Sequence, residues 1–381
     1  MFFSLTFIET HRIYELQEAL LSFFQRCASN TSYSLDCFPE WFRSTLTDSD
    51  KLRERFELVA KLIQSQDNRI RIHILAVFEN NNRIQELCEN TNLSLEILDD
   101  IEEEINGVKI NLKKEIKDLF DYLYENVLGR NNLFNNGKDL SIKQHHEEFR
   151  EKNEVVCPFC GMGIYPDMKA EYDKTSKTYN DKTNRRSNYD HYLARKSYPL
   201  AAVNFKNLVP MCEDCNNSPN KGSKDILFTS DERTTRRKAF YPYSENSEVK
   251  LSVLCEDWSI YNTKGTWNAE ITPSSDDDSE KVETWNNVFN ISSRLSNRIR
   301  GHNRTWLMQF FYSVPRDECN VEALRERFRI EAQKWSKFKK TAADSIVKEA
   351  FFSYLAQRAT ETEVISFCSN LGYMRAFKNP T

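Results

Sequence analysis

Glycine is scarce in this chain, with 9 among 381 residues, or about a third of its average usage. A collagen-like repeat needs glycine at every third position, and a turn-rich all-β fold also uses it heavily. The apolar fraction of 39% is low but still globular, and charged residues make up 29%. The composition therefore excludes collagen-like, disordered and disulfide-scaffold proteins, and it favours helix over a turn-rich β fold.

Long apolar runs are also missing. The longest clear one covers residues 74–78, far below the roughly 20 residues that a membrane-spanning helix needs. Residues 1–8 are apolar, but they have neither a basic flank nor a small-residue cleavage site. We therefore read this start as a strand or the beginning of a helix, and we expect a cytoplasmic protein without a membrane partner.

The chain has no excess of basic residues, because 53 Lys and Arg stand against 57 Asp and Glu, a net charge of −4. A generally basic surface for nucleic acid is therefore not supported. Residues 171–240 differ, with 14 Lys and Arg against 9 Asp and Glu, a net of +5. Binding to a phosphate backbone would have to come from this local patch.

The pattern of apolar residues predicts an α+β, mainly helical protein in three parts. Residues 1–135 read as a helical domain for partner docking or DNA binding, with helices over 15–24, 52–63 and 97–128, and an interruption of the last helix at Gly107 stays open. A turn-rich linker at 131–137 precedes a central domain over 138–240, in which 169–189 form a loop or long hairpin. Residues 241–381 read as strands at 249–254, 258–261 and 267–271, then helices at 280–300, 304–312, 321–338 and 342–359.

Four of the ten cysteines are patterned. Cys157 and Cys160 form one C-x2-C pair, Cys212 and Cys215 form another, and 51 residues separate the pairs. Two such turns complete a tetrahedral zinc site, and the glycines after Cys160 suit a tight turn around it. A redox C-x2-C motif would not need a second pair. The other six cysteines, which are scattered singly, read as buried free thiols.

Residues that could bind a catalytic metal or transfer a proton lie between the two cysteine pairs and directly after the second one. Asp190 and His191 are adjacent, so on a strand their side chains point to opposite faces. Asn207 follows in the middle, and Asn216 comes directly after the fourth cysteine, where we expect a helix to start. Carboxylate and amide oxygens are hard ligands that suit Mg²⁺ or Mn²⁺, and a neutral imidazole can take a proton from water.

This order of residues over about 157–224 resembles the HNH endonuclease family, whose ββα-metal core, treble-clef-like, is often stapled by zinc. The resemblance implies that His191 is the general base and that Asp190 and Asn216 bind the catalytic metal. It implies that Asn207 fixes the loop near His191, and that the four cysteines hold structural zinc. Asn stands here at the third motif position, where the family also has His, and Asn220 is an alternative ligand to Asn216.

The resemblance implies a metal-dependent endonuclease that hydrolyses DNA, with RNA as an open alternative. By analogy with stand-alone HNH proteins, it further suggests the nuclease effector of a bacterial defence system, restrained by a partner such as an ATPase. A homo-oligomer also stays open. The competing interpretation is a zinc module that binds nucleic acid or protein without catalysis, or a decayed nuclease.

Basic residues near the motif are candidates for phosphate contacts. The candidates are Arg195, Lys196, Lys221 and Lys224, with Arg185 and Arg186 as further ones that also fit a solvated hairpin surface. In the C-terminal part, Arg294, Arg298, Arg300, His302 and Arg304 form a basic cluster, either a phosphate track or a salt-bridged helix face. We read His145 and His146 as surface residues outside the site.

Overall fold

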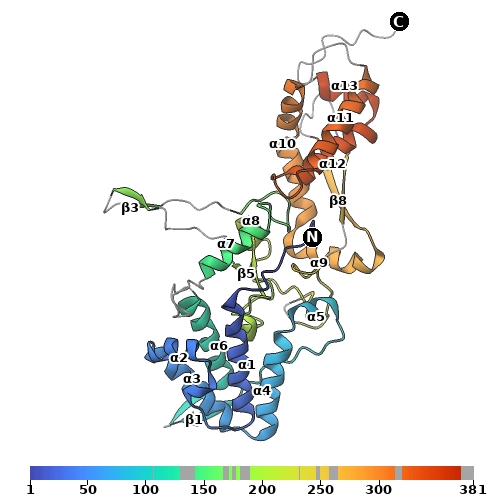
Figure 1. Ribbon diagram of the computed structural model, residues 1–381. Coiled ribbons are helices and arrows are strands. Elements are labelled where there is room, and N and C mark those ends of the chain that lie inside the picture. The colour runs from blue at the N-terminus through green and yellow to red at the C-terminus, as the bar shows by residue number, and fades with distance from the viewer. Residues whose placement is uncertain are drawn as a thin grey trace.

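The computed structural model shows an elongated chain with a group of helices at each end (Figure 1). It describes residues 1–105, 107–128, 142–165, 171–173, 177–180, 189–230, 232–245, 249–256, 265–313 and 320–369. The strands of the described residues pair as four two-stranded antiparallel sheets. The structure is therefore α+β and mainly helical, as the composition predicts. No helix among the described residues has the length and apolar character to cross a membrane.

The N-terminal end is a packed group of helices. They are α1 (Glu15–Ala28), α2 (Glu40–Thr47), α3 (Asp50–Gln64), α4 (Asn68–Asn81) and α5 (Ile84–Glu89), with short turns η1 (Arg12–Tyr14) and η2 (Leu35–Cys37). Helix α1 buries Leu16, Ala19, Leu20, Phe23 and Phe24 on one face, the helical spacing that the sequence predicts. The Asp67 side chain caps α4 by accepting a hydrogen bond from Ile70 N.

The helix predicted over 97–128 is wrong in its first half. A hairpin of β1 (Glu102–Ile105) and β2 (Val108–Asn111) stands there, and the helix α6 covers only Leu112–Tyr122, followed by the turn η3 (Leu123–Val127). Gly107 has a φ of +78°, which suits glycine at a reversal of the chain. The Asn111 side chain then caps α6 by accepting from Lys114 N, so the helix begins after the hairpin.

The central part carries short elements. They are α7 (Ile142–Lys152), β3 (Glu171–Asp173), β4 (Thr178–Asn180), β5 (Tyr189–His191), η4 (Pro199–Ala201), β6 (Leu208–Pro210) and α8 (Glu213–Asn216). Strands β3 and β4 pair as a hairpin, one of the two forms predicted for 169–189. The prediction that a helix starts at Asn216 is wrong. Helix α8 ends at Asn216, because Cys212 occupies the N-cap position.

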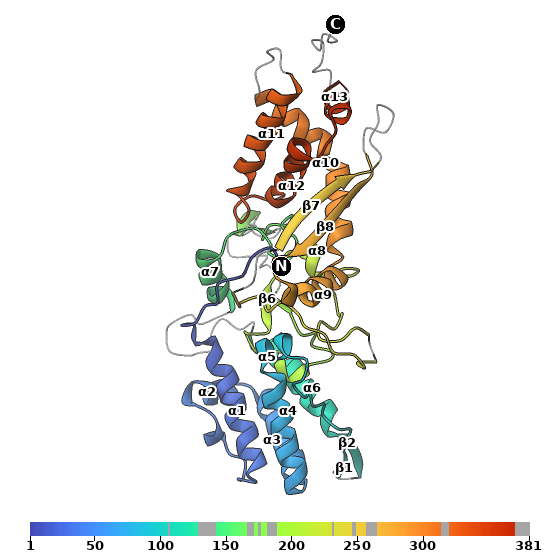
Figure 2. The same cartoon turned by 90° about the vertical axis from the view of Figure 1, so that its right-hand side faces the viewer.

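At the C-terminal end a β hairpin packs on helices. It comprises β7 (Val249–Cys255), β8 (Trp267–Pro273), η5 (Asp276–Asp278), α9 (Ser279–Phe289), α10 (Ile291–Ser313), α11 (Val321–Ser336), α12 (Ser345–Gln357) and α13 (Glu361–Ser369). The strands predicted at 249–254 and 267–271 are confirmed, and they lie against α10 and α12 (Figure 2). The strand predicted at 258–261 and the linker at 131–137 lie outside the described residues.

The break between the first two C-terminal helices is not where the sequence predicts it. Asn290 adopts the left-handed conformation with a φ of +54° and separates α9 from α10. Helix α10 then runs through Gly301, where a break was predicted, without interruption. Asparagine tolerates the left-handed region better than most residues, so it ends a helix more readily than an exposed mid-helix glycine does.

Two apolar cores enclose the central strands. The N-terminal core consists mainly of α1–α4 and α6, and the C-terminal core combines the cysteine region and α5 with β7, β8 and α9–α13. Leu208 on β6 belongs to the N-terminal core, and its neighbour Val209 belongs to the C-terminal core. The strand pair β5–β6 therefore lies between the cores, with its two faces turned to different ones. The division into domains at 135–138 and 240–241 stays a prediction.

Candidate functional site

The four patterned cysteines meet at one buried point. Their Sγ atoms all lie within 4.8 Å of one another, and the Cys160 and Cys212 sulfurs are 3.7 Å apart. Each pair sits on a tight turn: Gly161 N donates to Cys157 O at 2.9 Å, and Asn216 N donates to Cys212 O at 3.0 Å. The cluster can hold a metal ion, and four sulfur ligands are the donor set of structural zinc.

Glycine is required beside this cluster. A Cβ atom on Gly163 would lie 2.6 Å from Cys212 Sγ and 2.8 Å from Cys212 Cβ. The Gly163 amide also donates to Cys160 Sγ at 3.3 Å. Gly161 has a φ of +66°, in the region that favours glycine. The Cys157–Gly163 turn therefore fits closely around the sulfurs and stabilises thiolate charge.

A cation also faces the sulfurs. Arg294 on α10 donates from Nη1 to Cys215 Sγ at 3.3 Å and to Phe289 O at 3.2 Å. Burial raises the pKa of the Cys157 and Cys215 thiols, so positive charge is needed to hold them as thiolates. Arg294 supplies one charge and a divalent ion would supply the rest, which fits the cluster to a structural metal.

Asp190 and Lys221 form a buried ion pair next to the cysteines. Lys221 Nζ lies 2.7 Å from Asp190 Oδ2 and also donates to His191 O at 2.7 Å. Both side chains are buried, and Lys221 is only 1% exposed. Burial raises the pKa of Asp190 to about 6, against the opposing effect of Lys221. Lys221 is thus placed as the partner of Asp190, not as the surface phosphate contact that the sequence predicts.

His191 has one ring nitrogen fixed by the backbone. Its Nε2 lies 3.0 Å from Ala202 O, and the Tyr124 ring packs on the imidazole with centroids 4.4 Å apart. A carbonyl oxygen can only accept, so Nε2 carries the proton and Nδ1 keeps its lone pair. Burial lowers the pKa of His191 to about 4, which keeps the ring neutral near pH 7.

Asn207 joins the loop after β5 to the start of β6. Its side-chain Nδ2 donates to Leu193 O and to Ala201 O, both at 3.1 Å, and its Oδ1 accepts from Leu193 N at 2.7 Å. The side chain is fully buried. These bonds fix the loop that follows His191 and that returns to it through Ala202 O. Asn207 therefore holds the backbone around the imidazole without touching the ring.

The segment after the fourth cysteine folds back on itself. Lys221 N donates to Cys215 O at 3.2 Å, and Gly222 N donates to Asn216 O at 3.2 Å. The fold-back carries the Lys221 side chain to Asp190, and Asn216 is half-buried on the same segment. Asn220 instead donates from Nδ2 to Asp214 O at 2.6 Å, so its amide is engaged with the backbone on the outer side.

The basic residues predicted to contact phosphates differ in whether they already have partners in the chain. Arg195 pairs with Glu125 at 3.0 Å and Asp121 at 3.3 Å, and Lys224 donates to Val288 O at 3.0 Å. Lys196 is exposed. Arg185 and Arg186 lie outside the described residues.

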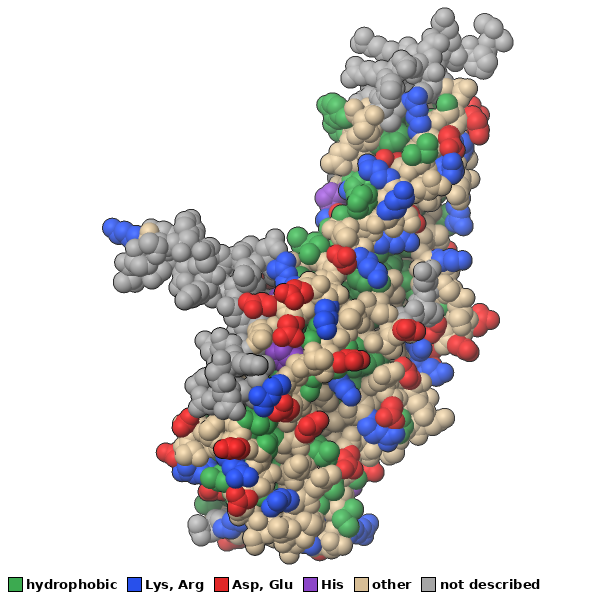
Figure 3. All heavy atoms as spheres, viewed as in Figure 1, with side chains coloured by type: hydrophobic (Ala, Val, Ile, Leu, Met, Phe, Trp, Pro, Cys, Tyr) green, Lys and Arg blue, Asp and Glu red, His purple; other side chains and the backbone are tan. Residues whose placement is uncertain are grey.

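The C-terminal basic cluster is partly a salt-bridged helix face. Arg298 forms a bidentate pair with Asp344, with nitrogen–oxygen distances of 2.9 and 2.7 Å. Arg294 is engaged with the cysteines, while Arg300 and Arg304 are exposed. Lys and Arg side chains are numerous over the C-terminal helices in Figure 3.

The expectation that His145 and His146 lie on the surface is wrong, because they are only 2% and 7% exposed. His145 Nδ1 lies 2.5 Å from the Tyr189 hydroxyl, and its Nε2 lies 2.9 Å from the Tyr14 hydroxyl. Helix α7 thus packs against the first residue of β5.

The sequence did not indicate three further residues of the site: Tyr124, Lys221 as the partner of Asp190, and Arg294 as a donor to Cys215. Their partners are far away along the chain. The only available hint was a lysine or arginine close to polar motif residues.

Comparison of the chain with protein-family models, with curated proteins and with solved structures finds no match. The functional argument therefore rests on the site itself.

Proposed function

We propose that the chain is a metal-dependent endonuclease of the HNH type that hydrolyses phosphodiester bonds of DNA. The observation that carries the proposal is a neutral imidazole with a fixed tautomer. The His191 Nδ1 lone pair is not used by the bond that Nε2 donates to Ala202 O, and His191 directly follows the buried Asp190 on a strand whose partner, β6, leads into the second cysteine pair. This combination is what general-base attack on a phosphate ester requires.

Each residue has a role in this proposal. His191 accepts a proton at Nδ1 from the attacking water, and the ring is neutral at pH 7 because burial lowers its pKa to about 4. Asn207 holds the loop that fixes the imidazole. The cysteines would hold Zn²⁺ and so anchor the short helix that ends at Asn216.

Asp190 and Asn216 would hold Mg²⁺ or Mn²⁺, with Asn220 as the alternative to Asn216. Asp190 Oδ2 is buried and lies 2.7 Å from Lys221 Nζ, so a divalent ion at this oxygen would have to displace the ammonium group. Such an ion, when bound, would neutralise charge on the scissile phosphate. Lys221 is the counter-charge of Asp190 in the metal-free chain, and the two cations would compete for the carboxylate. Lys196 is exposed and is the first candidate for a phosphate contact. Arg195 and Lys224 are further candidates, although both already have partners in the chain.

The test is plasmid cleavage by the purified full-length chain with Mg²⁺ or Mn²⁺, with an EDTA control. His191→Ala should reduce cleavage by about a hundredfold or more, the usual contribution of a general base, while zinc content stays at the wild-type level. His73→Ala is the matched control, because His73 is a half-exposed histidine on α4 that pairs with Glu96. Cleavage by His191→Ala at the wild-type rate would overturn the proposal. A labelled RNA in place of the plasmid separates the two nucleic acids.

A second candidate function is a zinc module that binds nucleic acid or protein without catalysis. The Asp190–Lys221 pair favours it, because the carboxylate has a charged partner without any divalent ion. Titration with Mn²⁺, followed by its electron paramagnetic resonance, distinguishes the two candidates. Binding that is lost in Asp190→Ala favours the nuclease, whereas DNA retention without Mn²⁺ binding favours the module. A defence role with an ATPase partner rests on the resemblance, and co-purification with the products of neighbouring genes tests it.

A further inference from the structure

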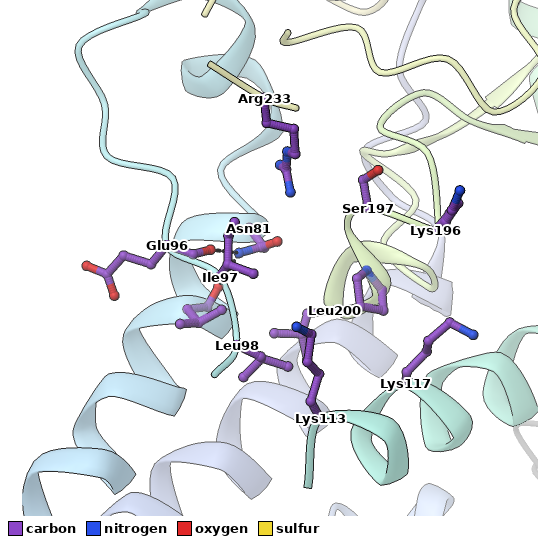
Figure 4. A pocket seen from close by; sticks show the side chains of 12 residues that line it. Asn81, Glu96, Ile97, Leu98, Lys113, Lys117, Lys196, Ser197, Leu200 and Arg233 are labelled. Carbon is purple, nitrogen blue, oxygen red and sulfur yellow. Dashed lines mark hydrogen bonds between the residues drawn. The ribbon is translucent and has the colours of Figure 1, made fainter. Parts of the chain in front are cut away.

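A cavity of about 250 Å³ lies between α4, α6 and the loop that follows β5 (Figure 4). We call it the Arg233 pocket. Four cationic side chains line it, together with an apolar wall: Lys113, Lys117, Lys196 and Arg233, with Ile97 and Leu200. The Glu96 side chain also belongs to the lining, but its carboxylate points away from the cavity and contacts His73 Nδ1 at 3.1 Å. The cavity is therefore a site of net positive charge.

Arg233 is held in place with donors to spare. Its guanidinium lies over the rings of Tyr198 and Phe228, 4.8 Å from each centroid. Its Nε and Nη2 atoms are buried and have no hydrogen-bond acceptor among the described residues. The closest carboxylate, Asp225 Oδ2, is 3.5 Å from Nε and already accepts from the Tyr198 hydroxyl at 3.0 Å.

The Arg233 side chain is 18% exposed, but buried donor atoms without an acceptor, such as its Nε and Nη2, cost free energy that an anion with aligned oxygens would recover. The side chain points into the cavity in Figure 4. The fork of two guanidinium nitrogens matches two oxygens of a phosphate.

Two lysines of the pocket have ion-pair partners, of which Asp121 is only 23% exposed. Lys113 pairs with Asp100 at 3.2 Å, and Lys117 pairs with Asp121 at 3.2 Å. The Asp100 side chain is 72% exposed, and exposed ion pairs of this kind contribute little to stability. Both lysines come from the first two turns of α6, and Lys196 faces them from the loop after β5. Lys113 can therefore turn to an anion in the cavity at small cost, whereas Lys117 would have to leave a partly buried carboxylate.

The rest of the lining calls for more than an inorganic anion. Ile97 is 51% exposed, an unusual state for a large aliphatic side chain on a cavity wall, and Leu200 faces it. Asn81 and Ser197 are the uncharged polar side chains of the lining. Because Asn81 Nδ2 already donates to Val77 O and Glu96 O, a flat ring with polar edges would cover the aliphatic wall and meet Ser197 and the Asn81 carbonyl oxygen.

We propose that the Arg233 pocket binds a 5′-mononucleotide, with the phosphate on Arg233 and the lysines and the base against Ile97 and Leu200. The nucleotide is either free or the 5′-phosphorylated end of a nucleic acid. The proposal does not depend on nuclease activity, because no residue with a role in the proposed cleavage except Lys196 lines the pocket.

The test is calorimetric titration of the full-length chain with AMP, GMP, CMP and UMP, and with inorganic phosphate and adenosine as partial ligands. At least one nucleotide should bind with a submillimolar Kd, and both partial ligands should bind at least about tenfold more weakly. Arg233→Gln should weaken nucleotide binding by about tenfold or more. Lys61→Gln, at an exposed lysine on α3 outside the pocket, is the matched control and should bind as the wild type does.

The outcomes are distinguishable. Absence of nucleotide binding overturns the proposal, and so does phosphate binding that equals nucleotide binding, because the apolar wall would then contribute nothing. If Arg233→Gln fails to fold, judged by circular dichroism, Lys196→Gln at an exposed position replaces it, and an unchanged Kd there overturns the proposal. A 5′-phosphorylated octanucleotide that binds more tightly than its unphosphorylated form identifies a nucleic-acid end as the source. Binding of free nucleotides alone identifies a free nucleotide.

Discussion

His145 should make the fold sensitive to mild acid. The imidazole is 2% exposed and lies between the hydroxyls of Tyr189 and Tyr14, with the His11 ring 5.1 Å away. Burial lowers the pKa of His145 to about 3, whereas an unfolded histidine titrates near 6.5. Between these two values the unfolded chain binds more protons than the folded chain. The contribution is therefore intact above pH 6.5 and is lost progressively as the pH falls.

The size of the effect follows from the two pKa values. Between pH 7 and pH 5, protonation of His145 in the unfolded state lowers the free energy of unfolding by about 2 kcal/mol. His11 and His191, whose pKa values burial also lowers to about 4, act in the same direction. Asp190, whose pKa is raised to about 6, acts in the opposite direction. The total change in the free energy of unfolding between pH 7 and pH 5 is thus a sum of opposing contributions. Only the difference between the wild type and a His145 variant isolates the contribution of His145.

The measurement is urea unfolding of the wild type and of His145→Gln at pH 7 and at pH 5. The wild type should lose about 2 kcal/mol more than the variant over this range, with similar slopes against urea. His302→Gln, at a half-exposed histidine on α10, is the control and should lose as much as the wild type. If His145→Gln and the wild type lose the same free energy, His145 is not a buried neutral histidine and the reasoning fails.

Three substitutions test the rest of the site. Gly163→Ala places a Cβ 2.6 Å from Cys212 Sγ and should lower the zinc affinity by about tenfold or more. Competition with a chelating dye measures this affinity, and an unchanged value would contradict the close packing at Gly163. Asn207→Ala removes three buried hydrogen bonds and should cost about 3 kcal/mol, so a loss below about 1 kcal/mol in urea unfolding would count against its role. Lys221→Met leaves the Asp190 carboxylate buried without its partner and should cost about 3 kcal/mol or more at pH 7; a melting temperature equal to that of the wild type would refute the ion pair.

The cysteine cluster could be predicted from the sequence because its geometry is largely local. Two residues between cysteines bring two sulfurs to one point, and a second pair of the same form leaves one plausible meeting place. The structure brings all four sulfurs together. The same holds for the amphipathic helix α1 and for the strands β7 and β8, whose apolar periods are visible in short windows.

Features that depend on distant partners could not be predicted in this way. Lys221 and Asp190 are 31 positions apart, and Arg294 and Cys215 are 79 positions apart, so no local pattern joins them. The hairpin of β1 and β2 was missed for another reason. Its glutamates favour helix by composition, and Gly107 and Asn111 override that preference through a left-handed turn and a helix cap.

The position of β5 between the two cores explains why catalysis and stability share residues in this proposal. Asp190 lies across from Val209, on the side of the C-terminal core, and His191 lies across from Leu208, on the side of the N-terminal core. Each side chain therefore takes its partner from a different part of the chain: Lys221 for the carboxylate and Tyr124 for the imidazole. A strand with both faces covered cannot turn without disturbing two cores. The proposed metal ligand Asp190 and the proposed base His191 are thus held rigidly by packing that neither core could supply alone.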